Sequence, residues 1–448
     1  MEVVVSYKTK ISRNDYKNCI DDTIKLYRSA VSFIVEIINN HWSTIAPLST
    51  KSRVNYVESL IHTTKGNTAL YDFDKEFYKF PSYLRRSAIQ DSVGIVSSYQ
   101  SNLSNYEEER YYSISNGKKF KKQKPKLSLT HFKCPVLYKG NMYLRLSDNQ
   151  VKIKVFKNND WQWIYLNLRN QDVKYIKNNC QKLKELSPIL TKKGRCHYLA
   201  FSFKDNVKLN KTKLKDQKIV AVDLGINTSA TCSLMSYDGT VHKRLFINQN
   251  REKDHQNHLI NRLKKKQKIG NKTSTYKSLW YKINSLNEQI INDTTNKIIK
   301  FAKENHADVI VFEYLNFKGK KIRGNNNIAT RLHLWCKRTI QDKVENKAHL
   351  SGIRMRRVNA RNTSALAFDG SGYVERNEEN YSLCVFKAGK KYHSDLNATY
   401  NIGARYYIKE IQKTTTEREW SRMVAKVPQL SARTKNTLST LISLLEVL

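Results

Sequence analysis

Two short apolar segments, each ending in a carboxylate, constrain the fold of this chain more than any other feature. The first reads Lys-Ile-Val-Ala-Val-Asp and ends at Asp223, and the second reads Asp-Val-Ile-Val-Phe-Glu and ends at Glu313. Such runs are typical of strands that are buried on both faces of a sheet. Between them the pattern predicts a hairpin over residues 230–247, with Asp-Gly at its turn, and a helix over residues 274–304. This order of elements predicts an α/β core with a mixed sheet.

A third acidic residue, Asp395, lies in the segment His-Ser-Asp-Leu-Asn-Ala-Thr-Tyr-Asn-Ile, where we expect it to begin a helix. The carboxyl ends of adjacent strands in an open α/β sheet face one crevice, so Asp223 and Glu313 should meet there. With Asp395 they would form the oxygen-rich site that Mg²⁺ prefers. We predict that Asp223, Glu313 and Asp395 are both the catalytic residues and the metal ligands. The cofactor would be Mg²⁺, with Mn²⁺ as a substitute, in a two-metal phosphodiesterase site.

The alternative for each acidic residue is a structural role. A single Asp at the end of a strand is more often a turn former or a helix cap than a metal ligand. The metal site is favoured by the conjunction, because Asp223 and Glu313 both end buried strands of one predicted sheet in a strongly basic chain.

The net charge indicates the partner. The 448 residues include 80 Lys and Arg against 39 Asp and Glu, which gives a formal charge of +41. A chain with this excess repels itself unless an anionic partner neutralises it. Nucleic acid is the first candidate and an anionic membrane the second. No apolar run reaches the roughly 18–20 residues that span a bilayer, so we predict nucleic acid and no membrane partner.

The cysteines and the N-terminus indicate the compartment. The seven cysteines form no Cys-x-x-Cys pair, which argues against a disulfide framework or a zinc ribbon. The N-terminus lacks the basic and then apolar pattern of a secretory signal. We expect a reduced, cytoplasmic protein that associates with the nucleoid when it is bound to DNA.

Several basic segments are candidates for gripping phosphate. Each could equally be a solvated linker or helix face, so we assign them as regions rather than as single contacts. Their residues are Lys118, Lys119, Lys121, Lys122, Arg262, Lys264, Lys265, Lys320, Lys321, Arg354, Arg356 and Arg357.

In the N-terminal half, the spacing of apolar residues changes from a helical to a strand-like pattern along the chain. Residues 1–11 predict a strand, and a helix follows with apolar residues at steps of four and three from Ile20 to Ile38. A second helix begins near Pro81. Residues 130–205 are rich in β-branched and aromatic residues between turn signals, which predicts a small antiparallel β module.

Three segments resemble the RuvC motifs of transposon-encoded TnpB (OrfB) proteins and of the compact type V CRISPR effectors related to them. They are Val-Asp-Leu-Gly-Ile-Asn around Asp223, Val-Phe-Glu-Tyr-Leu around Glu313 and Ser-Asp-Leu-Asn-Ala-Thr-Tyr-Asn-Ile around Asp395. Their order and their spacing of 90 and then 82 residues fit that family. The resemblance is closest over residues 218–410 and looser over the N-terminal half.

The resemblance implies an RNase H-like (RuvC) nuclease domain, with an N-terminal β-barrel wedge module that is interrupted by a helical recognition module. The predicted boundaries are 1–11 and 130–212 for the wedge module, 12–129 for the helical module with a basic loop at 116–128, 213–359 and 391–415 for the nuclease core, 360–390 for an insert, and 416–448 for a C-terminal tail. The implied activity is Mg²⁺-dependent, RNA-guided cleavage of double-stranded target DNA, with a guide RNA as partner.

The insert departs from the family pattern. The family usually carries four zinc-binding cysteines here, whereas the aligned positions hold Ala367, Gly370, Val385 and Ala388. None of these side chains can bind zinc, and Cys384 alone cannot form a site. We therefore predict no structural zinc. The insert would fold by small-residue packing and turns, or would order only on nucleic acid.

Other functions stay open at this point. A compact type V CRISPR effector would carry the same motifs. A nuclease-silent RNA-guided repressor is disfavoured because all three acidic residues are present, and a DNA-only transposase is a third candidate. The absence of a Gly-x-x-x-x-Gly-Lys-Ser/Thr loop argues against ATP hydrolysis. The sequence leaves open whether the protein works as a monomer or as a homodimer.

Overall fold

The computed structural model of the chain describes residues 1–12, 15–117, 119–128, 133–180, 183–269, 274–314, 337–376, 380 and 382–448. They form two compact units, and each is described by itself. Unit 1 comprises Met1–Val3 and Asn206–Leu448, and unit 2 comprises Val4–Asp205. Within these described residues, no helix combines the length and the apolar character needed to cross a membrane. The finer module boundaries stay predictions.

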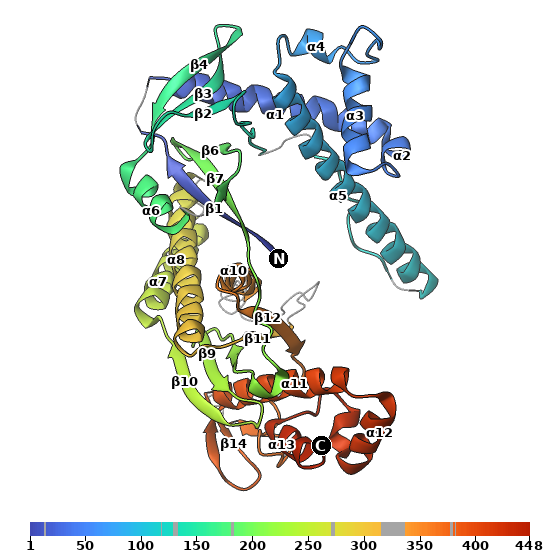
Figure 1. Cartoon of the computed structure of the whole chain (residues 1–448), viewed down its shortest axis with the longest axis vertical. Coiled ribbons are helices and arrows are strands. Elements are labelled where there is room, and N and C mark those ends of the chain that lie inside the picture. The colour runs from blue at the N-terminus through green and yellow to red at the C-terminus, as the bar shows by residue number, and fades with distance from the viewer. Residues whose placement is uncertain are drawn as a thin grey trace. The chain divides into compact units, whose positions relative to one another are not determined.

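The helical part of unit 2 is built on one long helix pair. Helix α1 (Lys17–Asn40) packs along α5 (Ser82–Ser115), and α3 (Thr50–Ile61) packs on α5 as well (Figure 1). Two single-turn helices, α2 (Trp42–Ile45) and α4 (Phe73–Glu76), connect them. The predicted apolar stripe of α1 is buried, and its members are Ile20, Ile24, Tyr27, Val31, Ile34 and Ile38. The predicted start of the second helix is also confirmed, because α5 begins directly after Pro81.

The strands of unit 2 form two sheets. In one, β7 (Cys196–Asn206) pairs with β1 (Glu2–Lys10), β5 (Lys184–Glu185) and β6 (Ile189–Lys193). The other consists of three antiparallel strands, which are β2 (Tyr143–Arg145), β3 (Gln150–Lys157) and β4 (Asp160–Asn167). Helix α6 (Asn170–Cys180) follows β4. The predicted β module is thus present, while its closure into a barrel stays a prediction.

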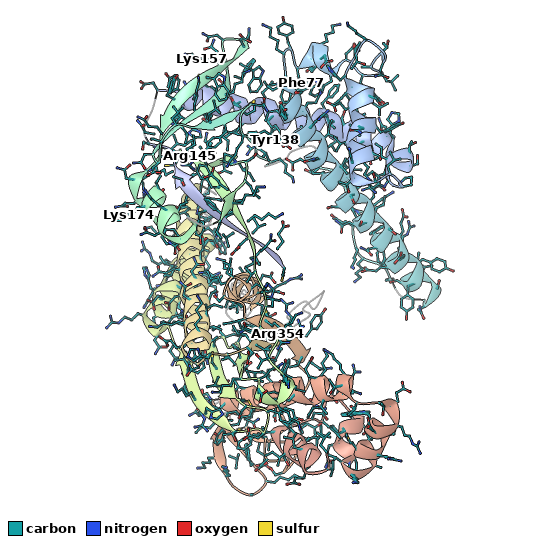
Figure 2. All side chains as sticks on the ribbon, viewed as in Figure 1. Phe77, Tyr138, Arg145, Lys157, Lys174 and Arg354 are labelled. Atoms are coloured by element: carbon teal, nitrogen blue, oxygen red, sulfur yellow. The ribbon has the colours of Figure 1, made fainter. Side chains whose placement is uncertain are left out.

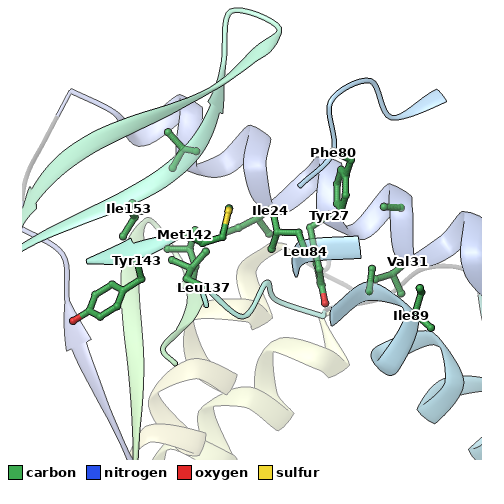
Figure 3. Close-up of a cluster of buried hydrophobic side chains, with 14 of the residues drawn as sticks. Ile24, Tyr27, Val31, Phe80, Leu84, Ile89, Leu137, Met142, Tyr143 and Ile153 are labelled. Atoms are coloured by element: carbon green, nitrogen blue, oxygen red, sulfur yellow. The ribbon is translucent and has the colours of Figure 1, made fainter. Parts of the chain in front are cut away.

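One apolar core joins the helices and strands of unit 2. Figure 3 shows Ile24 and Tyr27 of α1 beside Met142 and Ile153, which come from the β2–β3 region. Thr23 extends this junction, because its hydroxyl oxygen accepts a hydrogen bond of 2.9 Å from the backbone N–H of Phe156. The helical and β segments of unit 2 therefore fold as one body.

Unit 1 is built on a five-stranded mixed sheet in the order β10-β9-β8-β11-β12. Strands β8 (Ile219–Asp223), β9 (Ala230–Met235) and β10 (Val241–Ile247) are antiparallel neighbours. Strands β11 (Val309–Tyr314) and β12 (Arg354–Asn359) continue the sheet parallel to β8. The predicted α/β core with a mixed sheet is confirmed, including the hairpin between its first and fourth strands in chain order.

Helices cover both faces of this sheet. On one face, α8 (Ser274–Glu304) and α10 (Lys337–His349) form a core with side chains such as Val220 and Phe312. On the other face, α11 (Ser394–Thr414) and α13 (Leu438–Glu446) form a second core with Ile219 and Val309. The predicted bounds of the long helix, 274–304, are those of α8. A 3₁₀ turn, η1 (Leu214–Asp216), precedes β8.

Two parts of unit 1 are more ordered than the sequence pattern indicated. Helix α7 (Asn250–Lys268) was not predicted, and it packs on α8 through Leu259, Ile260 and Leu263. The segment that was described only as a tail forms α12 (Glu417–Lys426), the 3₁₀ helix η2 (Pro428–Ser431) and α13, and their apolar side chains join the core beneath α11.

Candidate active site

Asp223 and Glu313 occupy equivalent positions at the carboxyl ends of two neighbouring parallel strands. The ladder between β8 and β11 pairs Ile219 with Val309, and each carboxylate comes four residues later on its strand. Side chains alternate between the two faces of a strand, and Ile219 and Val309 lie in the core beneath α11. Asp223 and Glu313 therefore point toward the α11 face of the sheet, and both are half-buried.

Helix α11 runs antiparallel to β8. Near the C-terminal part of the helix, the hydroxyl of Tyr407 donates a hydrogen bond of 2.8 Å to the carbonyl of Gln217, just before β8 begins. Nearer its start, the hydroxyls of Thr399 and Ser233 lie 2.6 Å apart, and Ser233 pairs with Ala221 in the middle of β8. The start of α11 therefore points to the carboxyl end of β8.

This direction brings Asp395 to the same edge as the other two carboxylates. Gly403 of α11 lies so close to Ile219 and Met235 that a Cβ atom there would collide with Met235. From Gly403 back to Asp395 the helix rises about 12 Å. From Ile219 forward to Asp223 the strand rises about 13 Å. Asp395 is thus level with Asp223 along the direction of β8.

His393 fixes the start of α11. Its Nδ1 accepts a hydrogen bond of 3.2 Å from the backbone N–H of Asp395, so it caps the helix. Its ring packs edge-to-face on Phe246 of β10, with a distance of 4.9 Å between ring centres. Asp395 then lies in the first turn of α11, where the helix dipole favours a negative charge.

The carboxylate of Glu313 is held from the segment that follows β12. The hydroxyl of Thr363 donates a hydrogen bond to its Oε1, and the side-chain amide of Gln341 donates to its backbone carbonyl at 2.9 Å. Burial lowers the pKa of Arg405 to about 10, and the negative charge of Glu313 opposes this shift. Arg405 therefore lies within electrostatic range of Glu313 and stays protonated at neutral pH.

Arg405 is buried at 4% exposure and serves as a junction of three segments. Its guanidinium donates hydrogen bonds of 2.7–3.0 Å to the backbone carbonyls of Asn359, Arg361, Thr434 and Asn436. These contacts tie the end of β12 and the segment before α13 to α11. The backbone that leads to Thr363 is thereby fixed.

The three carboxylates fit Mg²⁺ in donor type, because Mg²⁺ prefers carboxylate oxygens together with water and phosphate. They also share one edge of the sheet. Among the residues that the structure describes, however, no three His, Cys, Asp or Glu side chains are grouped closely enough to hold one ion. The structure thus places the predicted ligands on neighbouring elements without gathering them around a single point.

Two asparagines of α11, one helical turn apart, dock the insert onto the core. The amide of Asn397 donates to the carbonyl of Leu366 and accepts from the N–H of Phe368, both at 2.8 Å. The amide of Asn401 donates to the carbonyls of Thr363 and Leu366 at 2.9 Å. The Asn residues of the third motif thus hold the segment that carries Thr363.

The described part of the insert folds around aromatic rings. A three-stranded antiparallel sheet, β13 (Glu375–Arg376), β14 (Leu383–Val385) and β15 (Lys391–His393), packs its inner face on this cluster. The ring of Phe368 meets those of Phe386 and Tyr392 edge-to-face at 5.4 and 5.0 Å. The core of the insert thus combines the small side chains of Ala367 and Cys384 with aromatic rings, and these rings were not part of the expectation of small-residue packing.

The positions that align with the family's zinc-binding cysteines have other surroundings. Ala367 is buried beside Cys384 and Phe386. Gly370 adopts a positive φ of 83° next to Ser439 of α13, and Ala388 is exposed in a turn. The absence of a structural zinc stays a prediction.

The basic residues on two predicted segments are largely exposed. Arg262 and Lys265 lie on the outer side of α7, and Lys264 is half-buried. Lys119 and Lys121 are exposed, whereas Lys122 forms an ion pair with Glu109 of α5. Lys118, Lys320 and Lys321 lie outside the described residues. Exposed cations of this kind also occur on α6, where Lys174 projects from unit 2 (Figure 2).

The basic run at 354–357 has a structural setting instead. It forms most of β12, within the mixed sheet, and Arg354 starts this strand (Figure 2). Arg357 forms ion pairs with Glu345 at 2.9 Å and Asp342 at 3.5 Å, both on α10. Arg356 donates to a neighbouring carbonyl at 3.2 Å. Sequence reasoning missed this role because the run reads as surface charge.

Sequence reasoning also missed Thr363 and Arg405. A signal for Arg405 exists, because it is a cation in the otherwise apolar run from Ile402 to Ile408 on the helix that begins with Asp395. Thr363 carries no such signal. Its hydrogen bond to Glu313 depends on a chain path that only the folded structure shows.

Comparisons with known proteins show a family match over part of the chain and a similarity of fold to solved structures. A model of the Aq_aa04 family matches residues 5–157, about a third of the chain. A search of curated protein sequences found no match. The Cas12f1 protein in the cryo-EM structure of a Cas12f1–sgRNA–target DNA complex aligns with a TM-score of 0.52 at 17% identity, over 86% of this chain and 81% of that chain.

Two further structures align with lower scores. A CRISPR-Cas12f ternary complex gives a TM-score of 0.31 at 16% identity, over 86% of this chain and 80% of that chain. CasPhi-2 (Cas12j) bound to crRNA and phosphorothioate DNA gives 0.43 at 9% identity, over 90% of this chain and 91% of that chain. The first similarity shows that the chain shares the fold of Cas12f1. The expected resemblance to compact type V effectors is therefore confirmed for the fold, and the relationship to TnpB proteins stays a prediction.

Proposed function

We propose that this chain is an RNA-guided DNA endonuclease that cleaves target DNA at a RuvC-like site. The observation that carries the proposal is the position of Asp223 and Glu313 at equivalent ends of parallel strands, with Asp395 level with them on α11. The Cas12f1 protein of the same fold was solved with a guide RNA and target DNA, which supports the same partners here. The charge of +41 suits a protein that holds two polyanions.

The proposed cofactor is Mg²⁺, with Mn²⁺ as a substitute, held by Asp223, Glu313 and Asp395. Two bound ions would activate a water and stabilise the leaving 3′ oxygen. The chain's own part is to orient the ligands. Thr363 donates a hydrogen bond to Glu313, Arg405 lies within electrostatic range of Glu313, and the N-terminus of α11 stabilises the charge of Asp395.

The finer assignments are part of the proposal. A transposon-encoded protein of TnpB type fits the three motifs, and a compact type V CRISPR effector is the alternative. The strands of unit 2 would form the wedge module, which would recognise a short flanking DNA motif together with the helical module. Exposed cations on α7, among them Arg262 and Lys265, would contact nucleic acid.

The test is the substitution Asp223→Ala in the full chain, expressed with its guide RNA and assayed on matching target DNA in Mg²⁺. Cleavage should fall by at least ~10²–10³, because one carboxylate of a shared site is lost. Asp216→Ala is the matched control, since Asp216 is exposed at the opposite end of β8. Cleavage by Asp223→Ala at the rate of the control would refute the proposal.

Other outcomes identify the rival functions. Target binding without cleavage in either Mg²⁺ or Mn²⁺ would identify a nuclease-silent RNA-guided binder. Strand exchange on bare transposon ends without any RNA would identify a transposase. Sequencing the RNA that copurifies separates the remaining pair, because a guide from a transposon end indicates TnpB type and a repeat-derived guide indicates a CRISPR effector.

A further inference from the structure

A cavity of about 350 Å³ opens beside the loop that follows Asp223. The loop contributes residues from Gly225 to Ser229, and the other walls come from α7, α8 and α10. Asp223 itself points to the α11 face of the sheet, whereas α8 and α10 cover the opposite face. The cavity and the three carboxylates therefore lie on opposite faces of the sheet, near the carboxyl end of β8.

Hydrogen bonds hold the loop wall of the cavity in place. Lys253 of α7 donates its ammonium to the carbonyls of Ile226 and Asn227. The buried side chain of Gln249 accepts from the hydroxyl of Ser229 at 2.5 Å and donates to the carbonyl of Ile290 on α8 at 3.1 Å. Such bonds on both sides of the loop indicate a preformed site, as is usual for ligand pockets.

Gly225 keeps this loop tight. A Cβ atom at Gly225 would come within 2.5 Å of the carbonyl oxygen of Thr228, so no larger residue fits the turn. The two residues from Asp223 to Gly225 span at most about 7 Å. Gly225, which lines the cavity, is therefore within about 7 Å of the backbone of Asp223.

The lining has the chemistry of a nucleobase site. Amide side chains provide most of the polar groups, and isoleucines provide apolar walls. The amides are Asn227, Asn250, Gln256, Asn257 and Asn287. Amides offer donors and acceptors together, which match the edges of bases. Lys253 and Asp254 offset each other in charge, so the interior does not favour a phosphate.

The amides of α7 lie on one face of that helix. Asn250, Lys253 and Asn257 are spaced by three and four residues, which places them on one side. In the sequence His-Gln-Asn-His at 255–258, the two middle residues, Gln256 and Asn257, line the cavity, while His255 and His258 are exposed. Some of the polar side chains of α7 thus face the cavity, and the others face solvent.

We propose that this cavity holds one unpaired nucleobase of the DNA strand that the site cuts, next to the phosphate at the carboxylate edge. This inference rests on the proposed function and extends it to how the strand is positioned. The isoleucines enclose the faces of the base, and the amides bind its edge. Capture of the base fixes the register of the strand relative to Asp223.

The test uses the full-length chain in EDTA, so that binding is measured without cleavage. The probe is a short single-stranded oligodeoxynucleotide with one 2-aminopurine, placed at each position in turn. At one position the fluorescence should rise, because the base leaves the stack and enters an apolar cavity. Asn257→Leu should abolish this rise and weaken binding about tenfold, because a polar contact to the edge of the base is lost.

The matched control is His258→Leu, an exposed neighbour on the same helix, which should behave as the unaltered chain. Asn250→Ala, at an exposed position of the rim, replaces Asn257→Leu if that variant does not fold. An undiminished rise in the folded pocket variants would refute the inference. A rise with the matching RNA probe and none with DNA would also refute it, because a strand other than the cut one would be bound.

The result is separable from the proposed nuclease activity. Asp223→Ala should still give the fluorescence rise, because the carboxylate does not line the cavity. If that variant cleaves DNA at full rate, the proposed function fails while the base site stands. If it loses cleavage and no chain gives the rise, the function stands and the base site fails.

Discussion

The hydroxyl of Thr363 donates a hydrogen bond to the carboxylate of Glu313, which joins the segment after β12 to the end of β11. Thr363 is only 2% exposed, and its own carbonyl accepts a bond of 2.9 Å from Asn401 of α11. One residue, through its hydroxyl and its backbone carbonyl, therefore connects a proposed metal ligand to the helix that carries another, Asp395. The orientation of Glu313 depends on how the insert docks on α11.

This relationship predicts the effect of Thr363→Val on catalysis. Valine keeps the shape but removes the donor, so Glu313 should lose orientation and the cleavage rate should fall about tenfold, which is near 1.4 kcal/mol for one lost bond to a charged group. Thr363→Ser keeps the hydroxyl and should retain most activity. Cleavage rates as a function of Mg²⁺ concentration measure both variants. Equal rates for valine and serine would show that the bond has no catalytic role.

Arg405 predicts a change in stability. Its guanidinium donates to four backbone carbonyls from two segments, at residues 359–361 and 434–436, and the single ammonium of lysine cannot reach them all. Arg405→Lys should lower the free energy of unfolding of the chain by about 2–4 kcal/mol, because buried carbonyls lose their donors. Urea unfolding followed by tryptophan fluorescence measures this difference.

Arg418→Lys is the control for that prediction. Arg418 is exposed on α12, and substitutions at such positions change stability by no more than about 0.5 kcal/mol. If both variants unfold at the same urea concentration, the contacts of Arg405 do not stabilise the chain.

The mixed sheet and two of its carboxylates could be predicted from the sequence because their signals are local. The apolar runs before Asp223 and Glu313 are buried on both faces, and their almost entirely apolar composition predicts this burial. The stripe of α1 from Ile20 to Ile38 is likewise a periodic signal. Such patterns predict where a strand ends, so they also predicted that Asp223 and Glu313 lie at the same edge of the sheet.

The rest depends on contacts between distant segments. Helix α7 is strongly polar and buries few apolar side chains, such as Leu259 and Leu263, so its period was weak. The hydrogen bond from Thr363 to Glu313 spans 50 residues of sequence. No local pattern specifies such a pair. The strand β12 was missed because its arginines, of which Arg357 pairs with Glu345, read as surface charge.

The aromatic core of the insert predicts that its fold does not depend on zinc. Phe386 is 1% exposed and packs against Phe368, so Phe386→Ala should cost about 3–5 kcal/mol of local stability. A zinc chelator should leave the protease resistance of the insert unchanged in the unaltered chain, whereas Phe386→Ala should be cut rapidly there. Zinc bound in equimolar amount to the purified chain, with protection lost on chelation, would contradict this prediction.

Unit 2 contains a charge cluster that predicts a pH dependence. Asp21 of α1 accepts hydrogen bonds of 2.7 Å from Lys192 of β6 and from His197 of β7. Burial by itself would raise the pKa of Asp21, but the bonds from Lys192 and His197 outweigh it and hold the pKa below its ordinary value. The ionised carboxylate therefore ties α1 to the sheet.

The lowered pKa of Asp21 fixes the sign of the effect. A carboxyl whose pKa is lower in the folded state stabilises the fold above its unfolded pKa, about 3.9, and this contribution is lost as pH falls through the folded value. Asp21→Asn should lower the melting temperature at pH 7 and flatten its decline below about pH 4. Asp22→Asn, at the exposed neighbouring position, should keep the steep decline of the unaltered chain. The measurement is the melting temperature of both variants between neutral and acidic pH. If the melting temperatures of both variants decline in parallel, Asp21 does not couple protonation to folding.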